Sequence, residues 1–305
     1  MSAPAMSARS WALLVLLATL WGGSFFLSKL ALAELPPFTI VGTRAVVAVI
    51  FLAVLLPLLG LPFPRGYSVW RRLFVIGLLN NAIPFGLIVW GQQFISTGLS
   101  ALLNGTTPLF TVLLGLLLTR DRKPTLPSIG GIVLGLAGVA VLVGPGALAG
   151  IGQGIAGEIA VLGAALSYGF AALYYRQVRD IPAGTVAFGQ LVCCAVVMIP
   201  LAFVFEQPLT LRPGPVSIGA IVLLGTLCTS IAYFIYFRLL HVAGPTNASL
   251  VTQLNPVMAM LLGFLFLGEV PGWNAYAAMA LIVAGFALVD GRILRRQKPS
   301  TSDMP

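Results

Sequence analysis

The sequence predicts an all-α, polytopic membrane protein with ten transmembrane helices, built as two inverted five-helix repeats whose N- and C-termini are cytoplasmic. Three observations lead to this fold class. Apolar stretches of membrane-spanning length follow one another along the chain, basic residues occupy every second connection, and the second half of the sequence repeats the first.

The apolar stretches fill nearly the whole chain. Charged residues make up 8% of the sequence, hydrophobic residues make up 59%, and the mean hydropathy is +1.02. A bilayer core takes roughly 20 apolar residues per helix, and ten stretches reach about that length. They lie at residues 10–32, 38–60, 70–94, 98–119, 126–145, 155–175, 183–205, 215–240, 245–268 and 271–291. Little sequence is left for a soluble domain.

The basic residues fix the predicted orientation. Alternate connections and both tails hold 14 of the 17 Lys and Arg residues: Arg9, Arg65, Arg71, Arg72, Arg120, Arg122, Lys123, Arg176, Arg179, Arg238, Arg292, Arg295, Arg296 and Lys298. Because basic residues resist translocation, this side of the membrane is predicted to be cytoplasmic. The net charge of +9 is therefore a topology signal, and a nucleic-acid surface would need a basic face on a folded domain.

An internal repeat relates the two halves. The run Thr107–Gly115 meets the run Asn255–Gly263 at a shift of 148 positions, and Asp121 meets Glu269 at the same shift. Shifts of 146 and 147 align further Leu, Gly, Pro and Ala positions in the neighbouring spans. Each half holds an odd number of spans, so the second half is predicted to enter the bilayer upside down, as in many secondary transporters.

The repeats define the predicted domains. The first repeat covers residues 10–145, the second covers residues 155–291, and a cytoplasmic tail follows at residues 292–305. Two mirrored halves can expose one central site alternately to either side of the membrane.

Several motifs resemble a known family. They are the run Trp21-Gly22-Gly23-Ser24-Phe25, the Pro-to-acidic runs that end at Asp121 and Glu269, and the Gly-rich fifth and tenth spans. The chain resembles the drug/metabolite transporter superfamily with two EamA repeats, over nearly all of residues 10–291. It is similar to bacterial amino-acid exporters, including those for aromatic amino acids, which implies amino-acid export across the bacterial inner membrane.

Polar and aromatic side chains inside the spans are the candidate substrate-binding residues. Uncharged amides and hydroxyls beside aromatic rings suit a zwitterionic or neutral small molecule with an apolar side chain. The alternative for each residue is a hydrogen bond between helices, worth about 0.6 kcal/mol. The candidates are Trp21, Ser24, Phe25, Asn80, Asn81, Phe85, Asn104, Thr107, Tyr168, Tyr174, Thr229, Tyr233, Thr252, Gln253 and Asn255.

Three prolines are candidate gating positions. Pro84, Pro108 and Pro256 are expected to break or kink their helices and to free backbone carbonyls that face a cavity. The alternative is a structural kink filled by packing.

The few charges within spans bear on ion coupling. Arg44 lies early in the second span and is expected to snorkel to the outer face. No acidic residue occupies the middle of a span, which favours facilitated transport over proton antiport. Glu158 and His241 are the residues that could carry a proton if this interpretation is wrong.

The sequence carries no signature of an enzyme, a cofactor site or a metal site. HExxH, P-loop and GxSxG motifs are absent, and a lipid-modifying enzyme would need a catalytic cluster that this chain does not offer. The predicted function is export of amino acids, aromatic or apolar ones above all, or of similar small metabolites, by alternating access as a facilitated uniporter. The alternatives are a proton-coupled multidrug or organic-cation exporter of the same fold, and a channel. Expected partners are a small-molecule substrate and the lipid bilayer but no nucleic acid, and the choice between monomer and homodimer is open.

Overall fold

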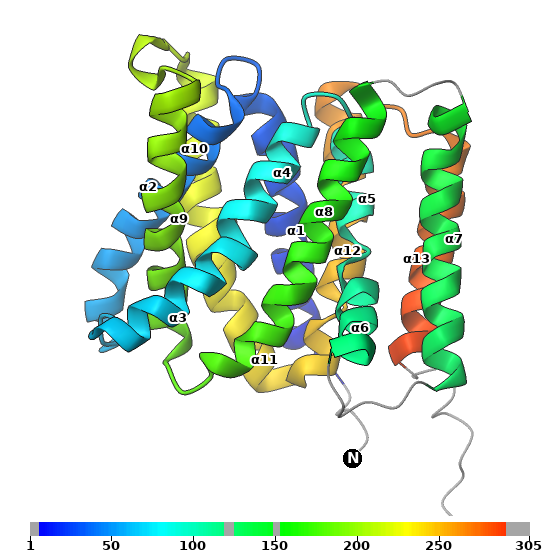
Figure 1. Ribbon diagram of the computed structural model, residues 1–305, viewed down its shortest axis with the longest axis horizontal. Helices are drawn as coiled ribbons and strands as arrows, with labels where there is room; N and C mark the ends of the chain where they lie inside the picture. Colours follow the sequence, from blue (N-terminus) through cyan, green and yellow to red (C-terminus); the bar gives the residue numbers. More distant parts are fainter. Residues whose placement is uncertain (1–5, 119–124, 149–152, 291–305) are drawn as a thin grey trace, which may run out of the picture.

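A computed structural model describes residues 6–118, 125–148 and 153–290 (Figure 1). Within these residues the regular elements are all helices. Eight helical units are long and apolar enough to cross a membrane. The predicted spans 245–268 and 271–291 correspond to two shorter apolar helices. All ten predicted spans are therefore helical, and eight of them are long enough to cross a membrane. The basic residues at 120–123 and beyond 291 lie outside the described residues.

The first half holds three unbroken spans, one span that contains a π-helical segment, and one that is interrupted. Its elements are α1 (Ala8–Ala31), α2 (Pro37–Leu58), α3 (Tyr67–Gly77), the π-helical η1 (Leu78–Ala82), α4 (Ile83–Gly91), α5 (Thr97–Asn104), α6 (Thr107–Leu118) and α7 (Leu126–Leu148). α3, η1 and α4 form one continuous span, whereas α5 and α6 are separated by a turn.

The second half repeats this order. Its elements are α8 (Gln153–Tyr174), η2 (Tyr175–Gln177), α9 (Ala183–Phe205), η3 (Pro208–Thr210), α10 (Pro215–Gly225), the π-helical η4 (Thr226–Ile231), α11 (Ala232–Ala248), α12 (Val251–Leu267) and α13 (Trp273–Asp290). In Figure 1, α1 leaves the end of the molecule where the N-terminus lies, and α8 runs in the opposite direction.

The two π-helical segments occupy equivalent positions. η1 begins at Leu78 and η4 begins at Thr226, 148 positions later, which is the shift that aligns the Pro108 and Pro256 regions. π-Helical residues are rare in proteins, well under about 1%. A matching pair at the shift of the sequence repeat therefore indicates that the halves share one internal plan.

Equivalent helices of the two halves each pack against the other half. α1 of the first half packs on α12 of the second, and α8 of the second half packs on α6 of the first. Gly22 and Gly169, 147 positions apart, lie at these two contacts, where they approach Met258 and Phe110 respectively. Small residues allow such close approach between membrane helices.

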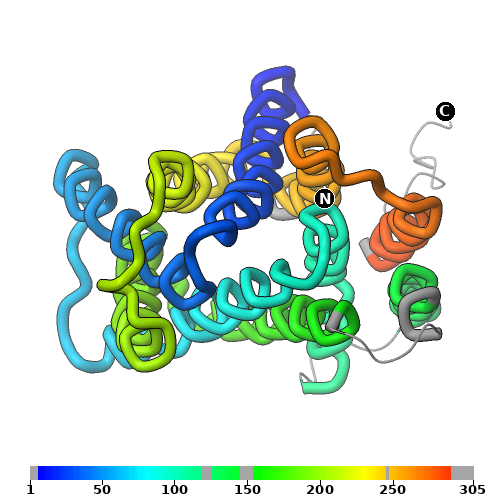
Figure 2. The backbone as a smooth tube through the Cα atoms, turned by 90° about the horizontal axis from the view of Figure 1, so that it is seen from above, coloured from blue at the N-terminus to red at the C-terminus, as the bar shows by residue number. Residues whose placement is uncertain are grey.

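The helices α7 and α13 form a peripheral pair. Figures 1 and 2 both show them side by side at one edge of the bundle. Gly131 and Gly285 face each other there, and a methyl group on Gly131 would lie 2.5 Å from the Gly285 carbonyl oxygen. The backbone contact within the monomer thus explains the glycines at 131 and 285.

Carboxylates tie the halves together at the end opposite the N-terminus. Glu206, after α9, accepts hydrogen bonds from the backbone N–H groups of Phe38 (2.8 Å) and Thr39 (2.6 Å) at the start of α2. Glu269, after α12, accepts the N–H of Thr97 at the start of α5 (2.9 and 3.0 Å). Helix N-termini carry unpaired N–H groups and a partial positive charge, so both contacts are favourable.

A third carboxylate also links the halves, but this one belongs to the first half and its partner belongs to the second. Glu34, after α1, accepts the N–H of Gly214 at 2.7 Å, next to the start of α10. All three carboxylates therefore link one half to the other. At the opposite end, Arg72 of the first half forms an ion pair with Asp180 of the second at 2.7 Å.

The glycine contact between α7 and α13 predicts that an alanine destabilises the protein at Gly131 but not at the adjacent Gly130. Gly131→Ala should lower the free energy of unfolding by about 1–3 kcal/mol, because its methyl group meets the backbone of α13. Gly130→Ala is the matched control, since no atom lies within 4 Å of its added carbon. Thermal unfolding of both variants in detergent should show a lower midpoint for Gly131→Ala alone; equal midpoints would contradict the contact.

Glu34 predicts a defined pH dependence. The Ser217 hydroxyl and the Gly214 N–H hold the pKa of Glu34 below its ordinary value of 4.5. The ionised carboxylate therefore adds stability above about pH 4.5, and this contribution is lost as the pH falls through the lower pKa of the folded protein. The difference in unfolding midpoint between wild type and Glu34→Gln should be constant from pH 5.5 to 7 and should shrink at pH 3.5. A difference that grows on acidification would show that the carboxylate is not the stabilising form.

Candidate functional site

Arg44 is buried in the centre of the bundle. Its side chain is 6% exposed, and its Nε donates a hydrogen bond to the Thr229 hydroxyl oxygen at 2.8 Å. Its guanidinium carbon lies 4.0 Å from the ring centroid of Phe85. The prediction that Arg44 snorkels to the outer face is therefore wrong, because a hydroxyl and an aromatic ring hold the guanidinium inside the protein.

Two adjacent amides of η1 meet a tyrosine of α11. The side-chain nitrogens of Asn80 and Asn81 each donate to the Tyr233 hydroxyl oxygen at 3.2 Å. Asn80 also donates to the Gln190 side-chain oxygen at 3.2 Å. The third, seventh and eighth spans thus converge on one polar cluster, in which Asn81 and Gln190 are fully buried.

The π-helical segments explain why these side chains point inward together. Pro84 lies two residues after the end of η1 and has no N–H to donate back to the preceding turn, which favours a widened turn there. The Ser167 hydroxyl donates to the freed Leu79 carbonyl at 2.8 Å. In η4, the hydroxyls of Thr229 and Ser230 donate to carbonyls five residues earlier, at 2.7 and 2.9 Å. π-Bulges are frequent at functional sites because they turn side chains out of the helical pattern.

Aromatic side chains continue the cluster toward α1. The ring centroids of Trp21 and Tyr236 are 5.3 Å apart, and the rings of Tyr233 and Phe237 stack at 6.0 Å. Tyr168 and Tyr233 lie close enough to Arg44 for electrostatic interaction. Trp21, Tyr168 and Tyr233 are each half-buried.

A second polar group lies where the fourth and ninth spans meet. α5 ends at Asn104, the chain turns at Gly105 and Thr106, and Gly105 approaches the ring of Pro256. Asn104 and Asn255 each bury a side-chain oxygen that has no hydrogen-bond partner among the described residues. In this conformation each of these oxygens is left without a hydrogen bond, and a ligand or water would have to be admitted to supply one.

Three of the candidate hydroxyls are satisfied within their own helices. Ser24 donates to the Trp21 carbonyl at 2.7 Å, Thr107 to the Asn104 carbonyl at 2.7 Å, and Thr252 to the Ser249 carbonyl at 2.8 Å. Gln253 reaches only the neighbouring Thr252 hydroxyl, at 3.5 Å. Among the candidate residues here, the amides of Asn104 and Asn255 therefore have unused hydrogen-bonding capacity, whereas these three hydroxyls do not.

The prolines of the fourth and ninth spans differ in their surroundings. Pro108 is the second residue of α6 and follows the interruption of its span. Pro256 lies inside α12, which is continuous as a helix from Val251 to Leu267. The two prolines therefore differ in their local structure, because the interruption in the ninth span falls earlier, at residues 249–250, between α11 and α12.

Two of the predicted site residues lie away from the polar cluster. Phe25 is buried in an apolar cluster with Ile88 and Ala259, and Tyr174 packs against a separate one that contains Leu73 and Ile76. Both side chains therefore contribute to apolar packing between helices. Gln190 was not predicted, although a glutamine in the apolar seventh span is itself a signal.

The two candidate residues for proton transfer differ in how far they are exposed. His241 is exposed near the end of α11, as expected of a residue at the membrane interface. Glu158 in α8 is 8% exposed, and one of its carboxylate oxygens is buried without a hydrogen-bond partner in the described part of the chain.

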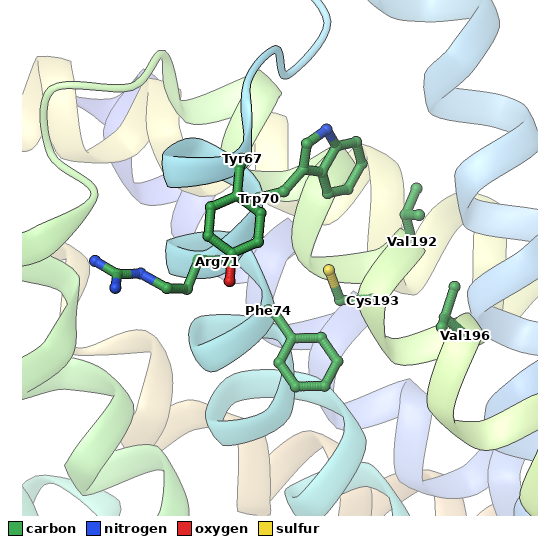
Figure 3. A pocket seen from close by; sticks show the side chains of 7 residues that line it. All are labelled: Tyr67, Trp70, Arg71, Phe74, Val192, Cys193 and Val196. Carbon is green, nitrogen blue, oxygen red and sulfur yellow. The ribbon is translucent and has the colours of Figure 1, made fainter.

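A groove on the outer surface is separate from this site. It has a volume of about 500 Å³ and lies between α3 and α9, lined by Tyr67, Trp70, Arg71, Phe74, Val192, Cys193 and Val196 (Figure 3). Tyr67 is 84% exposed, so the groove opens away from the interior. Aromatic and basic residues of this kind are typical of the membrane–water interface.

Comparison with known proteins supports a transporter. The EamA-like transporter family matches residues 9–144 and 155–289. The chain is 29% identical to "Uncharacterized inner membrane transporter YedA" of Escherichia coli (strain K12), with 92% of this chain and 90% of that protein covered. It is 25% identical to "Protein PagO" of Salmonella typhimurium, covering 95% and 94%, and 28% identical to "Protein PecM" of Dickeya dadantii, covering 82% and 81%.

A solved structure shares the fold. It is described as "Crystal structure of protein", is 21% identical, and is covered in full (100%) by 96% of this chain with a TM-score of 0.68. At this identity the likeness concerns the fold alone. Because the two family matches cover most of the sequence, the chain belongs to the EamA-like transporter family, whose members are drug/metabolite transporter-type membrane proteins.

Proposed function

We propose that this protein exports amino acids with aromatic or apolar side chains across the bacterial inner membrane, as a facilitated carrier that works by alternating access. The observation that carries the proposal is the cluster of Arg44, Asn80, Asn81 and Tyr233 between the two halves. Amide and hydroxyl groups suit the ammonium and carboxylate of an amino acid, and aromatic rings suit its side chain.

The contacts between the halves support alternating access. Opening the end opposite the N-terminus requires Glu206, Glu269 and Glu34 to leave the helix starts of the other half. Opening the other end requires Arg72 and Asp180 to separate. Each end thus has its own polar contacts, and one set can break while the other persists.

The proposed orientation places the N-terminal end in the cytoplasm. The α2–α3 connection, the beginning of α3 and the α8–α9 connection lie at this end in Figure 1, and together they carry Arg65, Arg71, Arg72, Arg176 and Arg179. The positive-inside rule then gives cytoplasmic termini, and ten crossings are obtained if the two shorter helices also span the membrane.

A proton-coupled exporter of organic cations is the second candidate. The buried, unpaired oxygen of Glu158 favours it, because an intramembrane carboxylate can exchange a proton. Arg44 opposes it, because a guanidinium in the central cluster repels a cationic substrate.

Counterflow in proteoliposomes tests the transport proposal. Vesicles preloaded with unlabelled phenylalanine should take up labelled phenylalanine faster than empty vesicles, without any proton gradient. A channel would show no acceleration by preloading. Uptake that requires an imposed pH gradient, and is lost in Glu158→Gln, would replace the facilitated mechanism by proton coupling.

The amide–tyrosine cluster predicts specific losses of affinity. Asn81→Ala and Tyr233→Phe should each raise the KM for exchange about threefold to tenfold, because a hydrogen bond contributes roughly 0.5–1.5 kcal/mol. Asn274→Ala is the control, since this amide donates to the Leu142 carbonyl at the peripheral α7–α13 pair. If the three variants have the same KM as wild type, the site lies elsewhere.

A further inference from the structure

Arg44 carries a charge that the protein does not neutralise. Its contacts are the Thr229 hydroxyl and the Phe85 ring, and neither has a negative charge. Within the ranges that the structure describes, the ion pair found is Arg72–Asp180, which lies at the end of the bundle. Isolated charges inside a membrane protein are costly, and those that are retained mark functional sites with a partner.

The contacts of the guanidinium leave one edge free. Thr229 occupies Nε, and Phe85 covers one face of the planar group. The two terminal nitrogens make no hydrogen bond to any part of the chain that the structure describes. These two nitrogens form the fork that binds a carboxylate through two parallel hydrogen bonds.

Neighbouring groups match the rest of an amino acid. The Tyr233 oxygen accepts hydrogen bonds from both Asn80 and Asn81, so its own hydroxyl hydrogen is available to an acceptor. The side-chain oxygen of Asn81 is fully buried and lacks a partner among the described residues, so it can accept a hydrogen bond from an ammonium group once the two halves separate to admit one. Tyr168 adds a half-buried ring near the guanidinium.

We propose that Arg44, held in place by Thr229 and Phe85, binds the carboxylate of the transported molecule, with Asn81 receiving its ammonium group. This inference rests on the proposed transport function and adds the substrate class: small molecules that carry a carboxylate next to an apolar body. A buried site built to hydrogen-bond one group rejects analogues that lack it, because its donors are then left unpaired. The amide of the same amino acid is therefore a poor ligand.

Direct binding tests the inference without transport. The full-length protein in detergent is titrated by calorimetry with phenylalanine, phenylalaninamide, which lacks the carboxylate, and 3-phenylpropionate, which lacks the ammonium. Wild type should bind phenylalanine at least tenfold more tightly than phenylalaninamide. Arg44→Gln should weaken phenylalanine about 10- to 100-fold, as expected for the loss of charge-assisted hydrogen bonds, and should leave phenylalaninamide within twofold.

Two further variants separate recognition from folding. Arg238→Gln makes the same chemical change at an exposed position of α11 and should preserve the preference of wild type. Thr229→Val keeps the charge but removes the partner of Nε, so it should reduce the preference for the carboxylate without abolishing it. If Arg44→Gln unfolds, the intermediate preference of Thr229→Val carries the test, and an unchanged preference there overturns the inference.

The outcomes also separate this inference from the transport proposal. If counterflow succeeds and Arg44→Gln discriminates phenylalanine from its amide as wild type does, carboxylate binding by Arg44 is wrong and the carrier remains. If counterflow of amino acids fails but 3-phenylpropionate binds in an Arg44-dependent way, carboxylate recognition holds and amino-acid export is wrong. If wild type binds none of the three probes, the inference is overturned.

Discussion

Every backbone polar group inside a bilayer needs a partner within the protein, and this requirement organises the interior of this molecule. Regular helices meet it by themselves, so polar side chains are needed only where a helix is irregular. η1 and η4 are such places, and hydroxyls of Ser167, Thr229 and Ser230 satisfy their carbonyls. The interruption after α5 follows the same rule, since the Thr106 hydroxyl donates to the Leu103 carbonyl at 2.6 Å. Helix irregularities therefore coincide with polar side chains, and the two candidate polar groups lie at these irregularities.

The sequence predicted the helices because their determinants are local. Apolar runs of sufficient length locate each helical unit. The shift of 148 positions that relates the two repeats also separates the two π-helical segments. The Gly-rich fifth and tenth spans were visible in the sequence, and the structure shows a backbone contact there between Gly131 and Gly285. The position of the break in the ninth span was harder to predict. Pro256 lies inside a continuous helix, and the break in the helix comes before it, at residues 249–250.

The site was less predictable because its geometry depends on contacts between distant spans. Asn80, Asn81, Thr229 and Tyr233 were identified as polar groups within apolar helices, but their assembly depends on the extra residue in each π turn. The direction of the Arg44 side chain follows from Thr229, 185 positions away, and no local pattern encodes it. Phe25 and Tyr174 show the converse, since aromatic residues in spans serve packing as readily as binding.

The uncompensated charge of Arg44 also bears on how the two halves move. Arg44 lies on α2 of the first half, and Thr229 lies on η4 of the second, so the guanidinium sits across their boundary. An unpaired charge costs more in a closed, dry site than in an open, hydrated one, whereas a bound carboxylate removes much of that difference. At 4 Å, the attraction between two opposite charges rises from about 1 kcal/mol in water to about 4 kcal/mol at an effective dielectric constant near 20. A ligand shifts a conformational equilibrium only through its different affinities for the two states. Under the proposed binding of a carboxylate at Arg44, the loaded carrier is therefore expected to close more readily than the empty one, and such a carrier would exchange substrate faster than it returns unloaded.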